Sequence, residues 1–161
     1  LTESNFSVFL GQKKLDNNDW DPVDNHTEWG VIADLGRKDS VVNLVVSYVM
    51  SEDNATLSGS DFTGETWELG LGLRKLIPMA PDIAPYIEAG VAFMDATRRQ
   101  TSTSSSDSAF AVWGGAGVSY AVGERVTVGV NTRYTSASAT LLSKDREVGG
   151  FHFGVTAGIG F

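Results

Sequence analysis

The sequence predicts an all-β fold, an antiparallel up-and-down β-barrel of eight strands, and two observations predict it. Eight segments alternate apolar and polar residues with a period of two, which is the pattern of strands with one apolar and one polar face. The connections between them differ in length, so that long connections gather on one rim of the barrel and tight turns on the other. An even number of strands then brings both chain ends to the tight-turn rim.

The segments follow one another along the whole chain, and we expect a single domain over residues 1–161. The expected strands cover 5–14, 28–35, 41–50, 63–74, 85–97, 109–121, 126–135 and 151–161. We expect long loops at 15–27, 51–62, 98–108 and 136–150, short polar turns at 36–40 and 122–125, and a medium connection at 75–84. Pro78, Pro81 and Pro85 are expected to keep this medium connection out of the hydrogen-bonded ladder.

In the first four strands, apolar side chains occupy alternate positions. These apolar faces consist of Phe6, Val8 and Leu10; of Trp29, Val31, Ala33 and Leu35; of Val42, Leu44, Val46, Tyr48 and Met50; and of Trp67, Leu69, Leu71 and Leu73. The first strand is the least regular, because Phe9 falls on its otherwise polar face.

The last four strands repeat this pattern. The fifth strand places Phe93 and Glu88 on opposite faces. The apolar faces of the other three consist of Phe110, Val112, Ala116, Val118 and Tyr120; of Val126, Val128, Val130 and Tyr134; and of Phe151, Phe153, Val155, Ala157, Ile159 and Phe161. The opposite face of the last strand carries His152, Thr156 and three glycines.

The composition favours lipid as the neighbour of the apolar faces. Hydrophobic residues make up 42% of the chain, the mean hydropathy is −0.06, and no run of about 18 apolar residues is present. A near-zero mean is typical of a membrane barrel in which alternate residues meet lipid. A soluble barrel or sandwich is the alternative, but the polar faces carry few charges and many of the 18 glycines, which suits a narrow lumen.

Charge and cysteine content exclude two classes of partner or site. The net charge of −8 and the sequence pI near 4.6 argue against a nucleic-acid partner, which would require a basic surface. Because the chain has no cysteine, it can form neither a disulfide framework nor a thiolate metal site.

The last strand, with its alternating apolar residues and its closing Phe161, resembles the terminal strand of bacterial outer-membrane β-barrels. In strand number and loop alternation, the chain is similar to small eight-stranded outer-membrane proteins of the X type, the opacity type and the barrel part of the A type. The resemblance implies a monomer in the outer membrane of a Gram-negative bacterium, with both termini periplasmic. Its implied partners are outer-membrane lipid, lipopolysaccharide and, during insertion, the barrel-assembly machinery.

The aromatic residues of the apolar faces are expected to form two girdles at the membrane interfaces, where Trp and Tyr are favoured. The girdle near the long-loop rim would contain Trp29, Tyr48, Trp67, Phe93, Phe110, Tyr134 and Phe151, and the girdle near the tight-turn rim Phe6, Tyr120 and Phe161.

The inward faces carry ionisable residues of both signs, and we expect them to form an interior polar network. Its members are Lys13, Glu28, Asp34, Glu68, Arg74, Glu88, Arg133 and His152. A buried charge persists when it is paired, so Arg74 is expected beside Glu88 and Lys13 beside Glu28 on adjacent strands. Such a network would fill an eight-stranded barrel and block a pore. The alternative is a gated or proton-responsive path lined by Glu68, Arg133 and His152.

The first long loop is acidic, and its oxygen ligands are candidates for calcium or for divalent bridges to lipopolysaccharide. The candidate ligands are Asp16, Asp19, Asp21 and Asp24. The loop lacks the glycine and the distal glutamate of an EF-hand, so a solvated acidic loop is the alternative. Trp20 within it is predicted to be either a lid over the barrel mouth or a contact for a partner.

These observations favour a structural or surface-interaction role, in envelope integrity or adhesion, for a barrel with a packed polar interior and acidic loops. A channel or transporter for small or apolar solutes is the first alternative, and a lipid-modifying enzyme is the second. We expect no enzyme activity and no cofactor, because no nucleophile, base and acid are recognisable around His26 or His152.

Overall fold

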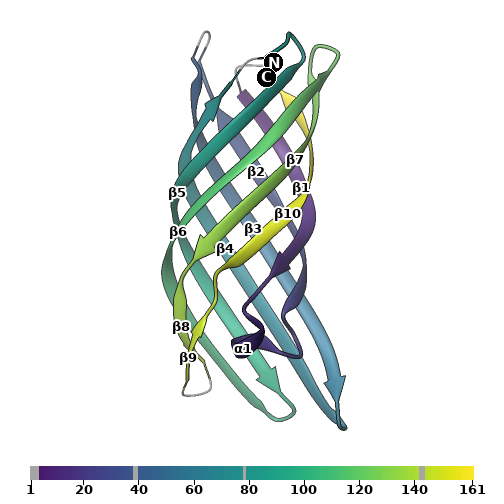
Figure 1. The fold of residues 1–161 in the computed structure, drawn as a ribbon, viewed down its shortest axis with the longest axis vertical. Helices are drawn as coiled ribbons and strands as arrows, with labels where there is room; N and C mark the ends of the chain where they lie inside the picture. The colour runs from purple at the N-terminus through teal and green to yellow at the C-terminus, as the bar shows by residue number, and fades with distance from the viewer. Residues whose placement is uncertain (1–3, 38–39, 78, 142–143) are drawn as a thin grey trace.

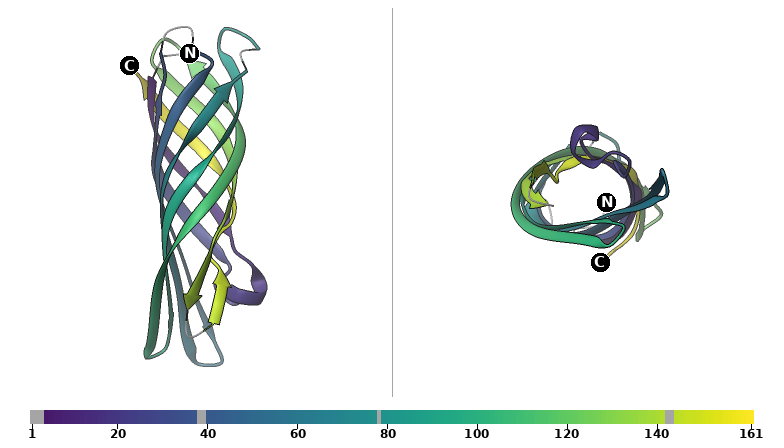
Figure 2. Two further views of the ribbon diagram at one scale, coloured as in Figure 1. Left: turned by 90° about the vertical axis from the view of Figure 1, so that its left-hand side faces the viewer. Right: turned by 90° about the horizontal axis from the view of Figure 1, so that it is seen from below.

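The computed structural model describes residues 4–37, 40–77, 79–141 and 144–161, and it confirms the predicted fold class. Eight antiparallel strands close into one barrel in the order β1-β10-β7-β6-β5-β4-β3-β2 (Figures 1 and 2). The barrel strands are β1 (Ser4–Lys14), β2 (Asn25–Leu35), β3 (Val42–Leu57), β4 (Ser60–Leu76), β5 (Ile83–Gln100), β6 (Thr103–Val122), β7 (Val126–Ser136) and β10 (Gly150–Gly160).

The barrel closes where β1 pairs with β10. Phe6 lies opposite Ile159, Val8 opposite Ala157, and Leu10 opposite Val155. The ladder continues past the strand end, because the Phe161 amide donates to the Ser4 carbonyl at 3.0 Å. Both chain ends therefore lie at the rim that carries the β2–β3, β4–β5 and β6–β7 connections, which is the tight-turn rim of the sequence prediction (Figure 1).

Apolar residues that the alternation assigned to one face point away from the barrel axis. Leu73, Val112, Phe110 and Ile159 are 58%, 63%, 84% and 63% exposed, whereas their inward neighbours are buried. Such a belt of exposed aliphatic and aromatic side chains is what a barrel in lipid requires. Among the described residues, no helix has the length and apolar character needed to cross a membrane.

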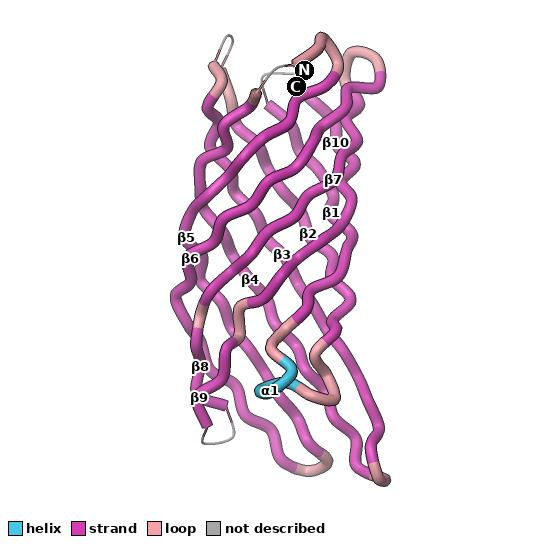
Figure 3. Tube along the Cα trace, viewed as in Figure 1, coloured by secondary structure: helices cyan, strands magenta, loops and turns pink. Residues whose placement is uncertain are grey.

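The prediction of long loops at 51–62 and 98–108 is wrong, because most of these residues belong to strands. β3 and β4 meet at a two-residue turn, Ser58 and Gly59, with φ of 52° and 79°, and β5 and β6 turn at Thr101 and Ser102. The four strands project as two hairpins beyond the rest of the barrel (Figure 3). Outside the apolar belt most side chains on both faces are polar, so the alternation that marked the strands is weak there. Side-chain hydrogen bonds across the strands, such as Thr56 to Asp61 at 2.8 Å, help to hold the extension. Ala55, Phe62 and Ala96 add packing in the apolar cluster of the interior.

The other two long loops contain secondary structure that the sequence did not reveal. Residues 15–24 include a short helix, α1 (Asn17–Trp20), and residues 137–149 include a two-stranded sheet of β8 (Ser138–Leu141) and β9 (Lys144–Glu147). Pro85, expected outside the ladder, lies in β5 opposite Val118, where its carbonyl accepts a hydrogen bond from Ile77. Pro78 and residues 38–39 of the short turn lie outside the described residues.

Glycines make room for the one tryptophan that lies across the middle of the barrel. A Cβ atom on Gly72 or Gly90 would come within 2.5 and 2.8 Å of the Trp113 ring. The same Cβ atoms would lie 2.5 and 2.2 Å from backbone carbonyls of neighbouring strands. The inward glycines of β4 and β5 are therefore a packing requirement of the narrow interior.

We expect Gly90→Ala to destabilise the refolded barrel by about 1–3 kcal/mol, because the added methyl group overpacks the interior. The measurement is urea unfolding in detergent micelles, followed by the compact migration of the folded barrel in cold SDS. Gly114→Ala is the control, since its Cβ atom would meet nothing nearer than 3.8 Å and should cost far less. Equal unfolding midpoints for the two variants would contradict this account.

Candidate functional site

The charged interior begins near the tight-turn rim with a cluster around Arg74. Its guanidinium lies 2.7 Å from Glu88 Oε2 and 2.8 Å from Asp34 Oδ2, and it stacks on the Tyr86 ring at 4.0 Å. All four residues are buried. Asn43 donates a further hydrogen bond to Asp34 at 2.6 Å. The structure thus brings Arg74 and Glu88 together and adds Asp34 as a second counter-charge.

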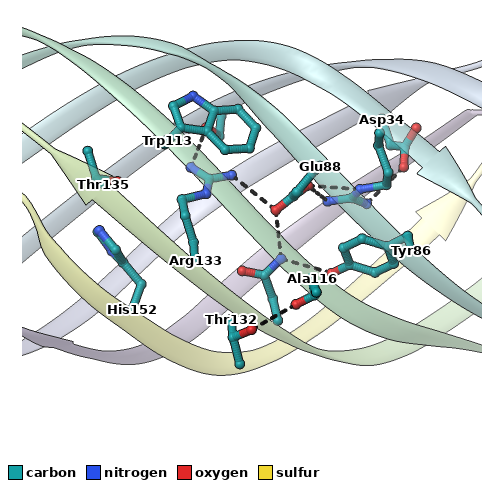
Figure 4. Close-up of polar contacts among 12 residues, drawn as sticks. Asp34, Tyr86, Glu88, Trp113, Ala116, Thr132, Arg133, Thr135 and His152 are labelled. Atoms are coloured by element: carbon teal, nitrogen blue, oxygen red, sulfur yellow. Dashed lines mark hydrogen bonds and ion pairs between the residues drawn. The ribbon is translucent and has the colours of Figure 1, made fainter.

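A second cluster lies further along the axis around Arg133 (Figure 4). Its guanidinium lies 4.0 Å from the centre of the Trp113 ring, 3.5 Å from Glu68 Oε1 and 3.6 Å from Glu88 Oε1. Asn131 donates to Glu88 Oε1 at 2.9 Å. Glu88 therefore links the two arginines, and the clusters form one network across the barrel.

The third part of the network contains Glu28 and His152. His152 Nδ1 is 2.9 Å from the Glu28 carboxylate, and its Nε2 is 3.9 Å from Glu68 Oε2. His152 Nε2 and Glu68 Oε2 have no hydrogen-bond partner among the described residues. Lys13 does not bond to Glu28 but donates from Nζ to the Thr66 hydroxyl at 3.1 Å.

Hydroxyl groups connect Lys13 to the mouth of the barrel. Thr66 Oγ1 lies 2.7 Å from Ser51 Oγ, and Ser51 Oγ lies 3.0 Å from His26 Nδ1. His26 Nε2 in turn lies 3.2 Å from the Val23 carbonyl in the first loop. This chain of contacts leads from the charged interior to the residues that cover the mouth.

Trp20 is a lid over the barrel mouth. Its ring is fully buried, its indole donates to the Glu147 carbonyl at 2.7 Å, and it meets the His26 ring edge-on at 5.6 Å. A Cβ atom on Gly64 would touch the ring at 3.0 Å, so the ring reaches across to β4. Of the two roles predicted for Trp20, the structure shows the lid.

Asp19 joins the helical first loop to the last loop. Its carboxylate accepts a hydrogen bond from the Glu147 amide at 2.9 Å, and its carbonyl accepts from Arg98 at 2.9 Å and also from Arg146. Arg98 also donates to the Asp21 carbonyl at 3.1 Å. We call Trp20, Asp19, Arg98, Arg146 and Glu147 the mouth lock.

The four candidate calcium ligands do not converge. Asp19 belongs to the mouth lock, Asp16 accepts a hydrogen bond from the Asn18 amide at 2.8 Å, and Asp24 accepts one from Asn25 at 2.8 Å. Across the described ranges, no group of three or more His, Cys, Asp or Glu residues lies close enough to hold a metal ion. Calcium binding by this loop stays a prediction from the sequence.

The expected girdle residues lie on the outer wall. Trp29, Tyr48, Phe110, Tyr134, Phe151, Phe6, Tyr120 and Phe161 are exposed, and Trp67 and Phe93 are partly exposed. Near the loop end, four rings form a continuous row, with centroid distances of 6.2 Å from Tyr48 to Trp67, 5.6 Å from Trp67 to Phe93 and 5.5 Å from Phe93 to Phe110.

The interior also contains apolar clusters that sequence reasoning missed. Phe9, Ile32, Val45 and Val49 pack together near the middle, and Met94, Trp113 and several alanines pack below the lid. The signal was present, since these residues occupy inward positions of the alternation.

A closed barrel with an outward apolar belt and inward charges defines an integral membrane protein of the β-barrel class. The chain belongs to the outer membrane protein beta-barrel domain family, whose model matches residues 3–161. This membership places the protein in the bacterial outer membrane. A comparison with curated protein sequences finds no match.

Solved structures with the same fold include three outer-membrane proteins. Neisserial surface protein A is 15% identical, with a TM-score of 0.73 over 98% of this chain and 96% of that chain. The N-terminal β-barrel domain of Pseudomonas aeruginosa OprF is 17% identical, with a TM-score of 0.63 over 99% and 98%. Ail, the attachment invasion locus protein of Yersinia pestis, is 14% identical, with a TM-score of 0.66 over 98% and 97%.

We expect Arg74→Met to lower the free energy of unfolding by about 3–5 kcal/mol, because it leaves Asp34 buried without a counter-charge and Glu88 with Arg133 alone. Urea unfolding in micelles measures the loss. Arg99→Met is the matched control, since the Arg99 pair with Glu65 is 3.4 Å long and largely exposed. That control should cost no more than about 1 kcal/mol. If both variants unfolded at the same urea concentration, the network would not be stabilising.

We expect Trp20→Ala to loosen the mouth lock without unfolding the barrel, because the buried ring holds the first loop against the last. Trypsin should then cut the loop after Lys14 roughly tenfold faster, as in a region whose local stability has dropped. Migration in cold SDS should stay that of the folded barrel. Trp29→Ala removes an outward tryptophan and should leave the cutting rate unchanged; an unaltered rate in Trp20→Ala would refute the lid role.

Proposed function

We propose that the protein is a closed, non-conducting barrel whose acidic loop end makes contacts at the cell surface, in an adhesion or envelope-integrity role. The observation that carries the proposal is the distribution of charge. The interior is almost balanced, and nearly all of the net charge of −8 falls at the loop end. A surface of one sign attracts partners of the opposite sign and repels those of its own.

The loop end carries acidic residues in every connection. They are Asp16, Asp19, Asp21, Asp24, Glu52, Asp53, Asp61, Glu65, Asp95, Asp107, Asp145 and Glu147. By their positions in the sequence, five basic residues also belong to the loop end: Lys14, Arg98, Arg99, Lys144 and Arg146. Two of these, Arg98 and Arg146, donate hydrogen bonds to the Asp19 carbonyl in the mouth lock. The surface that remains is strongly acidic, which favours a cationic partner or divalent cations shared with lipopolysaccharide.

Three features support a barrel without a pore. The charged side chains of the interior pair with one another, Arg74 with Glu88 on the adjacent strand and Arg133 with Glu68 and Glu88 on strands further round the barrel. The cavity beside Glu28, Arg133 and His152 holds about 10 Å³, and the one beside Asp34 and Arg74 about 30 Å³. These volumes suit one or two isolated waters rather than a continuous column. The buried Trp20 ring of the mouth lock occupies part of the outer end, where it bonds to the last loop.

The fold neighbours suggest the kind of role but not the partner. Two of them are titled a surface protein and an attachment invasion locus protein. Ail was also solved in complex with the heparin analogue sucrose octasulfate, which is a polyanion. The acidic loop end of this chain disfavours a partner of that charge.

We also propose an orientation of the barrel in the outer membrane and a route of insertion. The loop end faces outward and both termini face the periplasm, because long hairpins on one rim and tight turns on the other are the usual arrangement in outer-membrane barrels. The monomer would be inserted by the barrel-assembly machinery. The proposal includes no catalysis: the Ser51–His26 contact ends on the Val23 carbonyl instead of an orienting acid, and both side chains are buried.

Binding to polycations tests the surface role. We expect nanodiscs containing the protein to bind polylysine in a salt-dependent way and not to bind heparin. Replacing Asp16, Asp21, Asp53 and Asp61 by asparagine should weaken polylysine binding about tenfold, because four charges leave the loop end. Asp82→Asn with Glu124→Gln, at the tight-turn end, is the control. Heparin binding, or polylysine binding that ignores the four loop charges, would contradict the proposal.

Planar-bilayer recording tests the closed interior against the alternative of a channel. We expect no discrete conductance steps from the purified barrel, because charged pairs fill its interior and the two cavities beside them are small. Regular ion-conducting steps that disappear when the protein is heat-denatured would establish the channel instead.

A further inference from the structure

A cavity of about 200 Å³ lies on the outer wall at the level of the loop-end girdle. Trp29, Met50 and Trp67 form its apolar side, and they lie side by side because Met50 is opposite Trp29 on one strand and Trp67 on the other. Glu52, Glu65 and Asp95 form its acidic side. Glu52 and Glu65 lie two residues along their strands from Met50 and Trp67, on the loop side, and Asp95 is opposite Trp67 on the next strand.

Two carboxylates of this cavity are placed against each other. Glu52 and Glu65 are direct partners in the β3–β4 ladder and face the same side of the sheet. Like charges in this arrangement destabilise a sheet. Glu65 has one counter-charge, Arg99, at 3.4 Å, and Glu52 has no ion pair with any residue that the structure describes. The pair therefore costs stability that a bound cation would restore.

An apolar groove lies on the same strands, one step closer to the centre of the membrane. It holds about 310 Å³ and is lined by Leu69, Leu71, Val91, Phe93 and Phe110. The aromatic row joins it to the cavity, since the Trp67 ring lies 5.6 Å from the Phe93 ring and Phe93 lies 5.5 Å from Phe110. The two hollows together have the polarity of an amphiphile, with a charged end in the cavity and an apolar end along the barrel wall.

We propose that this wall binds a lipid with an ammonium headgroup, its headgroup in the acidic cavity and an acyl chain in the groove. Three carboxylates line the cavity, and its one neighbouring counter-charge is Arg99 beside Glu65, so the cavity favours a cation over an anion. The faces of Trp29 and Trp67 add cation–π attraction, which is strongest for tryptophan. A metal ion is disfavoured, because the carboxylates are not gathered into a metal-binding group within the described ranges. A soluble amine would make no use of the apolar lining of the groove.

This site is separate from the surface role proposed above. It lies on the side of the barrel that lipid reaches, and the loop aspartates that test polycation binding are not part of it. Failure of one proposal therefore leaves the other standing.

Quenching of tryptophan fluorescence by brominated lipid tests the site. Trp29 and Trp67 face outward at the cavity, whereas Trp20 and Trp113 are buried inside the barrel and give a constant background. The protein is reconstituted into phosphatidylcholine vesicles that contain a small fraction of either phosphatidylethanolamine or phosphatidylglycerol, each brominated near the carboxyl end of its acyl chains. We expect the quenching to show about fivefold more phosphatidylethanolamine than phosphatidylglycerol beside the tryptophans. This is roughly the preference that one cation–π contact with a neighbouring carboxylate would give.

The variant Glu52→Gln with Glu65→Gln should abolish this preference. The same variant should unfold at an equal or higher urea concentration, because it removes the opposed charges. Asp82→Asn with Glu124→Gln changes the net charge equally at the other end and should keep the preference. Equal quenching by the two lipids in the unaltered protein, or a preference that survives Glu52→Gln with Glu65→Gln, would overturn the proposal.

Discussion

The pairing of β1 with β10 removes the two free edges that an open sheet of these strands would present. In hydrocarbon, each unpaired backbone N–H or C=O group costs several kcal/mol, because no water can replace the lost hydrogen bond. Closure satisfies these groups along the whole circumference and ties the amide of Phe161 to Ser4. The apolar outer wall and the narrow inner space both follow from this closure. Alternation directs every second side chain into the lumen, and a barrel of eight strands has a narrow lumen.

The narrow cylinder explains why the interior is a network rather than a set of separate pairs. Side chains from opposite walls meet across the axis, so Arg133 on β7 reaches Ser47 on β3 at 3.1 Å and Glu68 on β4. Glu88 contacts both buried arginines. Each charge therefore depends on several others. The inward glycines have the same origin, since Trp113 can cross the lumen only where Gly72 and Gly90 lack side chains.

The loop end differs from the membrane part because its outer surface meets water, and polar side chains add hydrogen bonds and a buried cluster around Trp20 to the backbone ladder. The extended hairpins rely on polar cross-strand contacts, and the mouth lock relies on carbonyls of the first loop that accept from Arg98 and Arg146. An acidic surface can persist there because water solvates it. The opposed Glu52 and Glu65 stand at the boundary between the two environments, where charge and the aromatic row meet.

The sequence by itself determined the number of barrel strands, their order and the outward apolar belt, because a period of two is a local property that one lipid-facing wall imposes. It also predicted that Arg74 lies beside Glu88, since the two are partners on adjacent strands. It did not predict Asp34 as the second partner of Arg74, the stacking of Arg133 on Trp113, or the burial of Trp20. Only the tertiary structure decided these contacts, because they join residues across the lumen or between loops distant in sequence, where the distance is set by the closure of the barrel and not by any local pattern.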